Sequence, residues 1–146
     1  MRQIQIQQIL HLPVQIAALE REAVAEGFRF LTRLIEEWHS GINRFDAPGE
    51  CLMAAYQSDN LIGIGGITVD PYAPTETGRL RRLYVATSAR GQHVGQLLVA
   101  TLVERASQQF NVLRLSTDTP EGDAFYLRCG FQRSNEDRAT HVMHLG

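Results

Sequence analysis

The stretch LRRLYVATSARGQHVGQLLV, residues 80–99, decides how the chain is organised. The segment RLRRLYVA, residues 79–86, predicts a strand. After Gly91, apolar residues recur at helical spacing from Val94 through Phe110, which predicts a helix with one apolar face. A strand, a short turn and a helix that begins near Gly91 are therefore expected in direct succession.

A junction of this kind suits an anion. The first N–H groups of a helix lack partners inside the helix, and the helix dipole places partial positive charge there. Gly91 and Gly95 would let a ligand approach the main chain closely, and Arg90 adds a positive charge at the rim. The sequence has neither the Gly-Lys-Ser/Thr of a P-loop nor a GxGxxG after its first strand. GIGG, residues 63–66, lies inside a predicted strand, where close packing or a bulge explains it better.

The remainder of the chain alternates between strand and helix patterns. Going outward from the central stretch, we expect the following order of elements: a strand near 4–9, helices at 13–27 and 31–41, strands at 51–56, 61–69 and 79–86, a helix to 110, a strand at 112–117, a helix at 119–130 and a strand at 140–146. This order predicts an α/β fold (an α+β mixed sheet) with about six to seven strands flanked by about four helices. Residues 79–117 should form a crossover between parallel strands.

Composition narrows the class of protein. A chain of 146 residues with 44% hydrophobic and 21% charged residues predicts a single domain, residues 1–146. A net charge of -2 gives no basic field for nucleic acid or a membrane surface, and neither is expected as a partner. No apolar run is long enough to span a membrane, and the two cysteines do not have metal-site spacing. We therefore expect a cytoplasmic protein without a metal.

Two motifs together suggest a family. The stretch at 80–99 followed by DAFYLRCGF, residues 123–131, resembles the GNAT superfamily of acetyl-CoA-dependent N-acetyltransferases. Its members share a strand of type xLYV, a loop Arg/Gln-x-x-Gly-x-Gly/Ala that opens a helix, and a later FYxxxGF. The resemblance implies a GNAT-like single domain that uses acetyl-CoA as cosubstrate and acetylates a primary amine of a small molecule or peptide. The alternatives are a non-catalytic acyl-CoA-binding or regulatory module with the same fold, and a small domain that binds another phosphate ligand. Exposed edge strands make a homodimer possible.

The resemblance also implies which residues bind the cofactor. In the family, the main chain of the fourth strand bonds to the pantetheine arm, and the following loop holds the pyrophosphate. The matching positions are Leu83, Tyr84, Val85, Arg90, Gly91, Gln92, His93, Val94, Gly95 and Gln96. Leu83 and Val85 equally suit core packing, and Tyr84 should face the other way. His93 stands where the first motif glycine usually lies, and its side chain either faces solvent or contacts phosphate.

For catalysis, the resemblance identifies Tyr126 as the tyrosine that protonates the CoA sulfur. A tyrosine with an ordinary pKa of about 10 is protonated at neutral pH. Packing of Tyr126 beside Phe125 and Phe131 is the structural alternative. Arg79 occupies the position where many relatives carry a glutamate base, so the base is left open between a chain of water molecules and four side chains: Glu50, Asp70, Glu76 and His141.

The acceptor is expected near the two early helices and the loop HSGINRFDAPGE, residues 39–50. Arg79, Arg81, Arg82 and Arg90 form a basic cluster in a slightly acidic chain. Alternation along a strand predicts that they do not all face one ligand, and that some pair with glutamates of the early helices.

Overall fold

The structure is a computed structural model that describes residues 3–74 and 76–146. Its strands are β1 (Ile4–Gln8), β2 (Cys51–Gln57), β3 (Asn60–Val69), β4 (Thr77–Val85), β5 (Val112–Leu115), β6 (Gln132–Arg133) and β7 (His141–His144). Its helices are α1 (Ile16–Ala25), α2 (Phe30–Ser40), α3 (Val94–Ser107) and α4 (Pro120–Arg128), with a 3-10 turn at Thr87–Ala89. The expected order of elements is confirmed, and β6 is an addition, too short to produce a pattern in the sequence.

The strands form one seven-stranded sheet in the order β1-β2-β3-β4-β5-β7-β6. Strands β1 to β4 pair antiparallel, β5 pairs parallel with β4, and β7 pairs antiparallel with β5 and β6. The parallel pair β4–β5 is joined by α3, which confirms the predicted crossover. The fold is thus the mixed α/β arrangement expected from the sequence.

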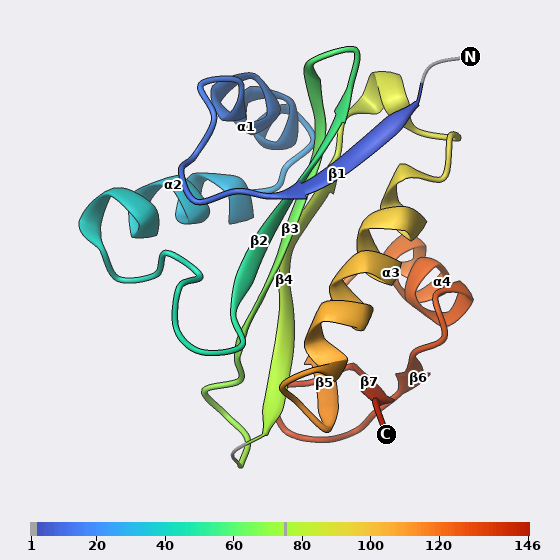
Figure 1. Cartoon of the computed structure of the whole chain (residues 1–146). Helices are drawn as coiled ribbons and strands as arrows, with labels where there is room; N and C mark the ends of the chain where they lie inside the picture. The colour runs from blue at the N-terminus through green and yellow to red at the C-terminus, as the bar shows by residue number, and fades with distance from the viewer. Residues whose placement is uncertain (1–2, 75) are drawn as a thin grey trace.

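Helices cover both faces of the sheet: α1 and α2 lie on one side, and α3 and α4 on the other (Figure 1). The glycines of β3 explain how closely α3 packs. A Cβ atom on Gly65 would lie 2.8 Å from Leu83 Cδ1 and 3.2 Å from Leu102 Cδ1. One on Gly63 would lie 2.9 Å from Leu98 Cδ1. The GIGG segment therefore serves packing, as expected.

Two irregularities of β4 shape the cleft that is described in the next subsection. Only Thr77, Gly78 and Arg79 pair with β5, although β4 continues to Val85, so the two strands separate. The register between β3 and β4 also shifts between Ile64 and Gly66, which is a β-bulge. Opposite this shift, Arg82 has a φ of 61°, a left-handed conformation that few residues other than glycine adopt.

The end of β4 leads into α3 less directly than expected. The helix begins at Val94 instead of near Gly91, because the chain first forms the 3-10 turn and then two left-handed residues, Gly91 (φ 85°) and His93 (φ 63°). The predicted start of α4 is confirmed: the Gly122 N–H donates to Thr119 Oγ1 at 3.0 Å.

Within the described ranges, the helices are all too short or too polar to cross a membrane. The same residues contain no group of three or more His, Cys, Asp and Glu placed to hold a metal ion. The cytoplasmic location and the absence of a metal stay predictions.

Candidate functional site

A cleft of about 1320 Å³ opens where β4 and β5 separate. Its walls are β4 from Arg79 to Val85, the turn that leads into α3, the segment from the end of β5 to α4, α4 itself, and the segment that joins α1 to α2. The cleft therefore reaches both faces of the sheet. We call the part beside α3 and α4 the cofactor end, and the part beside α1 and α2, with Phe28, Phe30, Arg33, Arg79, Arg81 and Arg82, the acceptor end.

The edge of β4 presents main-chain groups to the cleft. The Ala86 N–H donates to the Ile62 carbonyl of β3 at 2.8 Å. Because the direction of these groups alternates along an antiparallel ladder, and Tyr84 still pairs with Ile64, the N–H and C=O of Val85 and the C=O of Leu83 point away from β3. An extended ligand could therefore bond to β4 as an added strand.

The side chains of β4 alternate as expected near its end. Those of Leu83 and Val85 face α3 and α4: Val85 Cγ2 would lie 3.6 Å from a Cβ on Gly95. The Tyr84 ring faces the opposite side, with its centroid 6.1 Å from that of Phe30. Core packing and a main-chain role in binding are thus compatible for Leu83 and Val85.

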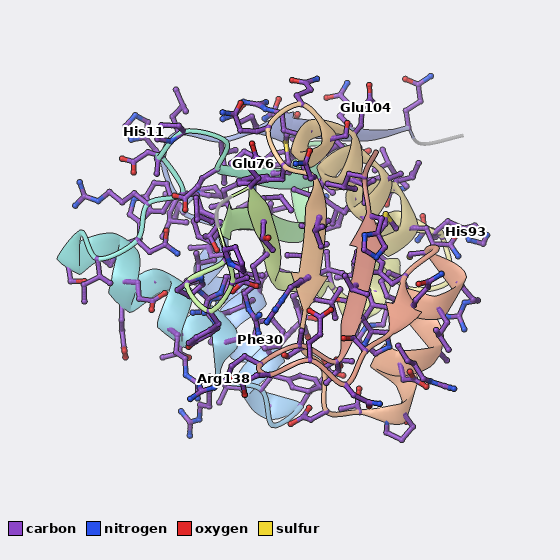
Figure 2. All side chains as sticks on the ribbon, turned by 90° about the horizontal axis from the view of Figure 1, so that it is seen from below. His11, Phe30, Glu76, His93, Glu104 and Arg138 are labelled. Atoms are coloured by element: carbon purple, nitrogen blue, oxygen red, sulfur yellow. The ribbon has the colours of Figure 1, made fainter. Side chains whose placement is uncertain are left out.

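The beginning of α3 lies at the cofactor end. Val94, Gly95 and Gln96 form its first turn, whose N–H groups have no carbonyl partner within the helix. His93 is the N-cap residue, but its side chain makes no capping hydrogen bond. Its Nδ1 lies 2.9 Å from Gln96 Oε1, and the exposed side chain projects from the edge of the molecule (Figure 2). Histidine is among the residues that tolerate a left-handed conformation, so His93 supplies the backbone shape of the missing glycine.

Gly95 is needed for packing in this structure. A Cβ on Gly95 would lie 3.1 Å from Phe125 Cζ, so the aromatic ring of α4 closes over the start of α3. Gly91 has no atom near its virtual Cβ, and its φ of 85° is the reason for a glycine there. The close approach that the sequence suggested for a ligand at Gly95 is made by Phe125.

Arg90 carries its charge toward α1. Its guanidinium donates to both oxygens of Glu26, at 2.8 and 2.6 Å, and its Nε donates to the Val85 carbonyl at 3.2 Å. The Tyr84 hydroxyl also donates to Glu26, at 2.5 Å. The hydrogen bonds from Arg90 and Tyr84 lower the pKa of Glu26 to about 2. The positive charge expected at the rim is therefore balanced by a carboxylate.

Most of the residues singled out in the sequence meet in this cleft. The ones that line it are Leu83, Tyr84, Val85, Arg90, Gly91, His93, Val94, Gly95, Gln96 and Tyr126. Gln92 is not among the lining residues, because its side chain turns to β2 and accepts a hydrogen bond from Gln57 at 3.1 Å. The roles of all eleven in binding and catalysis stay predictions.

Tyr126 satisfies both interpretations made from the sequence. Its ring packs edge-on against Phe125 and Phe131, with centroids 5.0 and 5.7 Å apart. It also lines the cleft, at the cofactor end. Burial raises the pKa of Tyr126 well above its usual value, so the hydroxyl keeps its proton at neutral pH.

The structure places the four suggested bases away from the cleft lining: Glu50, Asp70, Glu76 and His141. Asp70 is 2% exposed and lies between two guanidinium groups, at 3.2 Å from Arg79 and 3.1 Å from Arg114. His141 is also 2% exposed, with both ring nitrogens within hydrogen-bond distance of neighbouring side chains. Glu50 accepts hydrogen bonds from the N–H groups of Ala47 and Val69. Glu76 accepts one from the side chain of Asn111.

The acceptor end differs from the expectation in two respects. Arg79, Arg81 and Arg82 all line the cleft, because the bulge turns Arg82 to the face on which it meets Glu37 of α2, at 3.0 Å. The bulge therefore breaks the alternation on which the sequence prediction rested, and that the four arginines do not all face one ligand stays a prediction. The predicted pairing with glutamates of the early helices is confirmed. Several residues of the loop 39–50 line a separate hollow of about 380 Å³ instead of the cleft.

Among the lining residues that had no part in the sequence interpretation are Glu26, Phe28, Phe30 and Arg33. They belong to the end of α1, the short link and the first turns of α2. The only signal in the sequence was a pair of aromatic residues, Phe28 and Phe30, placed between the two predicted helices. So short a link does not require aromatic side chains of its own.

Comparisons with known proteins agree with this arrangement. A candidate acetyltransferase from Exiguobacterium sp. 255-15 superposes with a TM-score of 0.88 at 24% identity, over 97% of this chain and 93% of that one. A GNAT family N-acetyltransferase from Escherichia coli, solved in complex with CoA, gives 0.71 at 16% identity, over 100% and 83%. Glucosamine-6-phosphate N-acetyltransferase from Arabidopsis thaliana gives 0.64 at 14% identity, over 94% and 97%. No curated protein matches the chain.

At these identities the solved structures show a shared fold. The family model for the acetyltransferase (GNAT) family matches residues 14–131, which include the separated edge of β4, the start of α3 and Tyr126. Since that match spans most of the sequence, the chain belongs to the acetyltransferase (GNAT) family.

Proposed function

We propose that this protein transfers the acetyl group of acetyl-CoA to the nitrogen of a primary amine. One observation carries the proposal: the separation of β4 from β5 brings an unpaired strand edge, a helix N-terminus and the hydroxyl of Tyr126 to one cleft. These are the groups that a thioester with a phosphate-bearing tail requires.

Each group has a distinct task in the proposed complex. The main chain of Leu83 and the carbonyl of Val85 bond to the amides of the pantetheine arm, as a strand would. The N–H groups of Gly95 and its neighbours in the first turn of α3 receive the pyrophosphate. The Val85 N–H donates to the thioester oxygen, which gains negative charge as the amine attacks.

The reaction then proceeds by direct attack. The neutral amine nitrogen forms a bond to the carbonyl carbon, the carbon–sulfur bond breaks, and the sulfur leaves with the electron pair. The proton released by the nitrogen passes to water. A CoA thiol has an ordinary pKa near 8.5, so Tyr126, with its raised pKa, donates a hydrogen bond to the thiolate and keeps its own proton.

The cleft lining offers the amine no effective base. Glu26 is a weak base, since its pKa is about 2, and the four suggested bases do not line the cleft. The reaction therefore uses the fraction of the amine that is already neutral in solution, and water accepts the proton released after attack.

The test is thiol release from acetyl-CoA in the presence of a panel of primary amines, with the acetylated product identified by mass spectrometry. Acetyl-group radiolabel gives a clean second readout, because the sequence contains no lysine that could become acetylated on the protein itself. We expect thiol release that depends on the amine. A protein that binds acetyl-CoA but releases no thiol with any amine would be the non-catalytic acyl-CoA-binding module instead.

A further inference from the structure

Arg81 is the half-buried cation of the acceptor end that has no ion-pair partner in the part of the chain that the structure describes. It lines the cleft, yet no carboxylate of residues 3–74 and 76–146 lies within ion-pair distance of its guanidinium. The neighbouring arginines of the cleft wall are all balanced by carboxylates: Arg79 by Asp70 at 3.2 Å, Arg82 by Glu37 at 3.0 Å and Arg90 by Glu26 at 2.6 Å.

An unbalanced charge in this position is costly. Burial, together with the positive charges of Arg82 and Arg79, lowers the pKa of Arg81. A guanidinium nevertheless stays protonated in proteins, so the charge persists in a partly shielded site. Glu37 is the one acidic side chain that favours the charge of Arg81, and it is already bonded to Arg82. An anion in the cleft would supply the missing partner.

The backbone is shaped to present this side chain. In a regular strand, consecutive residues point to opposite faces, but the bulge lets Arg81 and Arg82 both line the cleft. The shape has a cost, since Arg82 takes a left-handed φ of 61°. Gly66, opposite Arg81, has no room for a side chain, because a Cβ would lie 2.5 Å from the Phe45 ring.

The surroundings of Arg81 suit a small ligand. The aromatic side chains of Phe28 and Phe30 form an apolar wall on the same side of the cleft. Arg33, one helical turn after Phe30, is exposed and adds a second positive charge at the mouth. The acceptor end thus combines apolar surface with one inner cation that can make a two-pronged bond to oxygen atoms.

We propose that the acceptor is a small primary amine that also carries a carboxylate or phosphate, and that Arg81 binds this anionic group while the amine faces Val85. The inference rests on the proposed function and names its substrate class. Arg81 acts in recognition: it selects the acceptor and orients it, whereas the main chain at the cofactor end holds the thioester.

The experiment compares matched acceptors that differ only in the anionic group. β-Alanine is paired with β-alaninamide for the carboxylate, and O-phosphoethanolamine with ethanolamine for the phosphate. With the wild-type protein, we expect kcat/KM to be about 10- to 100-fold higher for the charged member of at least one pair, as hydrogen bonds between charged groups give. The pair that shows the preference identifies the anion.

Three variants assign the preference to Arg81. Arg81→Gln should lower kcat/KM for the anionic acceptor by about 10- to 100-fold, mainly through KM, and that for its uncharged partner by less than about threefold. Arg81→Lys should restore part of the preference, because lysine keeps the positive charge but lacks the planar guanidinium group that can make two parallel hydrogen bonds. Arg21→Gln, an equal change of charge on the exposed side of α1, should behave as wild type.

Acetyl-CoA binding, measured by calorimetry on each variant, separates the two proposals. Equal use of charged and uncharged acceptors, an equal loss for both in Arg81→Gln, or acetylation of none of the anionic amines by a protein that binds acetyl-CoA would overturn the inference. Failure of the wild-type protein to bind acetyl-CoA would overturn the proposed function itself.

Discussion

The two ends of the cleft are built from different parts of the polypeptide. At the cofactor end, the groups offered to a ligand are main-chain ones, on β4 at Leu83 and Val85 and in the first turn of α3. At the acceptor end they are side chains, above all Arg81 and the rings of Phe28 and Phe30. One end therefore depends on the path of the backbone, and the other on the identity of individual residues.

This difference explains which departures each end tolerates. His93 replaces a motif glycine at the cofactor end, yet it takes the left-handed φ of 63° that the turn requires and turns its side chain outward. At the acceptor end, a change of Arg81 or Glu37 alters the charge that a ligand meets. We therefore expect substitutions at the two ends to affect different kinetic constants.

The largest effect among the catalytic tests is expected at the cofactor end, from the side chain of Tyr126. Tyr126→Phe removes the donor to the leaving sulfur and should lower kcat by about 100-fold, with little change in KM for either substrate. Steady-state kinetics measure it, with Tyr56→Phe, on β2 outside the cleft, as the matched control. An unchanged kcat would reduce Tyr126 to a packing residue.

A smaller effect is expected from pH. Below the pKa of the acceptor, the neutral fraction of the amine falls tenfold per pH unit, and kcat/KM should fall with it. Glu26 does not change this dependence, because a carboxylate with a pKa of about 2 is too weak a base to deprotonate the amine. The raised pKa of Tyr126 predicts no descending limb in kcat below about pH 10. A plateau that begins well below the pKa of the acceptor would instead reveal a base in the protein.

The smallest effect concerns Glu26, which links Arg90 to Tyr84. Because its pKa in the folded protein is lowered to about 2 from 4.5, its contribution to stability is present above pH 4.5 and is lost as the pH falls toward 2. Its side chain is 30% exposed, so Glu26→Gln should cost only about 1 kcal/mol at pH 7, or about 2–4 °C in Tm. Thermal unfolding at pH 7 and pH 2 measures it, and an equal loss at both pH values would contradict the ion-pair account.

The same contrast governs how much the sequence could predict. The cofactor end is encoded locally: a strand, a turn with Gly91 and Gly95 and an apolar helix face follow one another, and ten of the eleven predicted residues line the cleft. The mixed sheet and the parallel crossover follow from the same periodicity. A site made of main-chain groups can be predicted from the sequence, because it requires only that the backbone follow a particular course.

The acceptor end could not be predicted from the sequence, because it depends on side chains that are far apart along the chain. It is assembled from the link after α1, the start of α2 and the middle of β4, which come together only in the folded chain. Its arrangement also depends on a one-residue bulge near Arg82, which breaks the regular alternation expected for these arginines. Likewise, the partner that neutralises Arg90 is Glu26, far away in sequence.

The central claim is that the start of α3 and the edge of β4 bind acetyl-CoA. Calorimetric titration of the wild-type protein, Gly95→Glu and Gly95→Gln with acetyl-CoA tests it most directly. Both variants place a side chain of the same size against the Phe125 ring, but only the glutamate adds a negative charge. The free-energy difference expected for a negative charge about 4 Å from phosphate is about 4 kcal/mol at an effective dielectric of 20.

We predict binding by the wild-type protein and an affinity at least 100-fold lower for Gly95→Glu than for Gly95→Gln, with circular dichroism and thermal unfolding confirming that each variant folds. The absence of acetyl-CoA binding in folded wild-type protein, or an equal affinity in the two variants, would contradict the account.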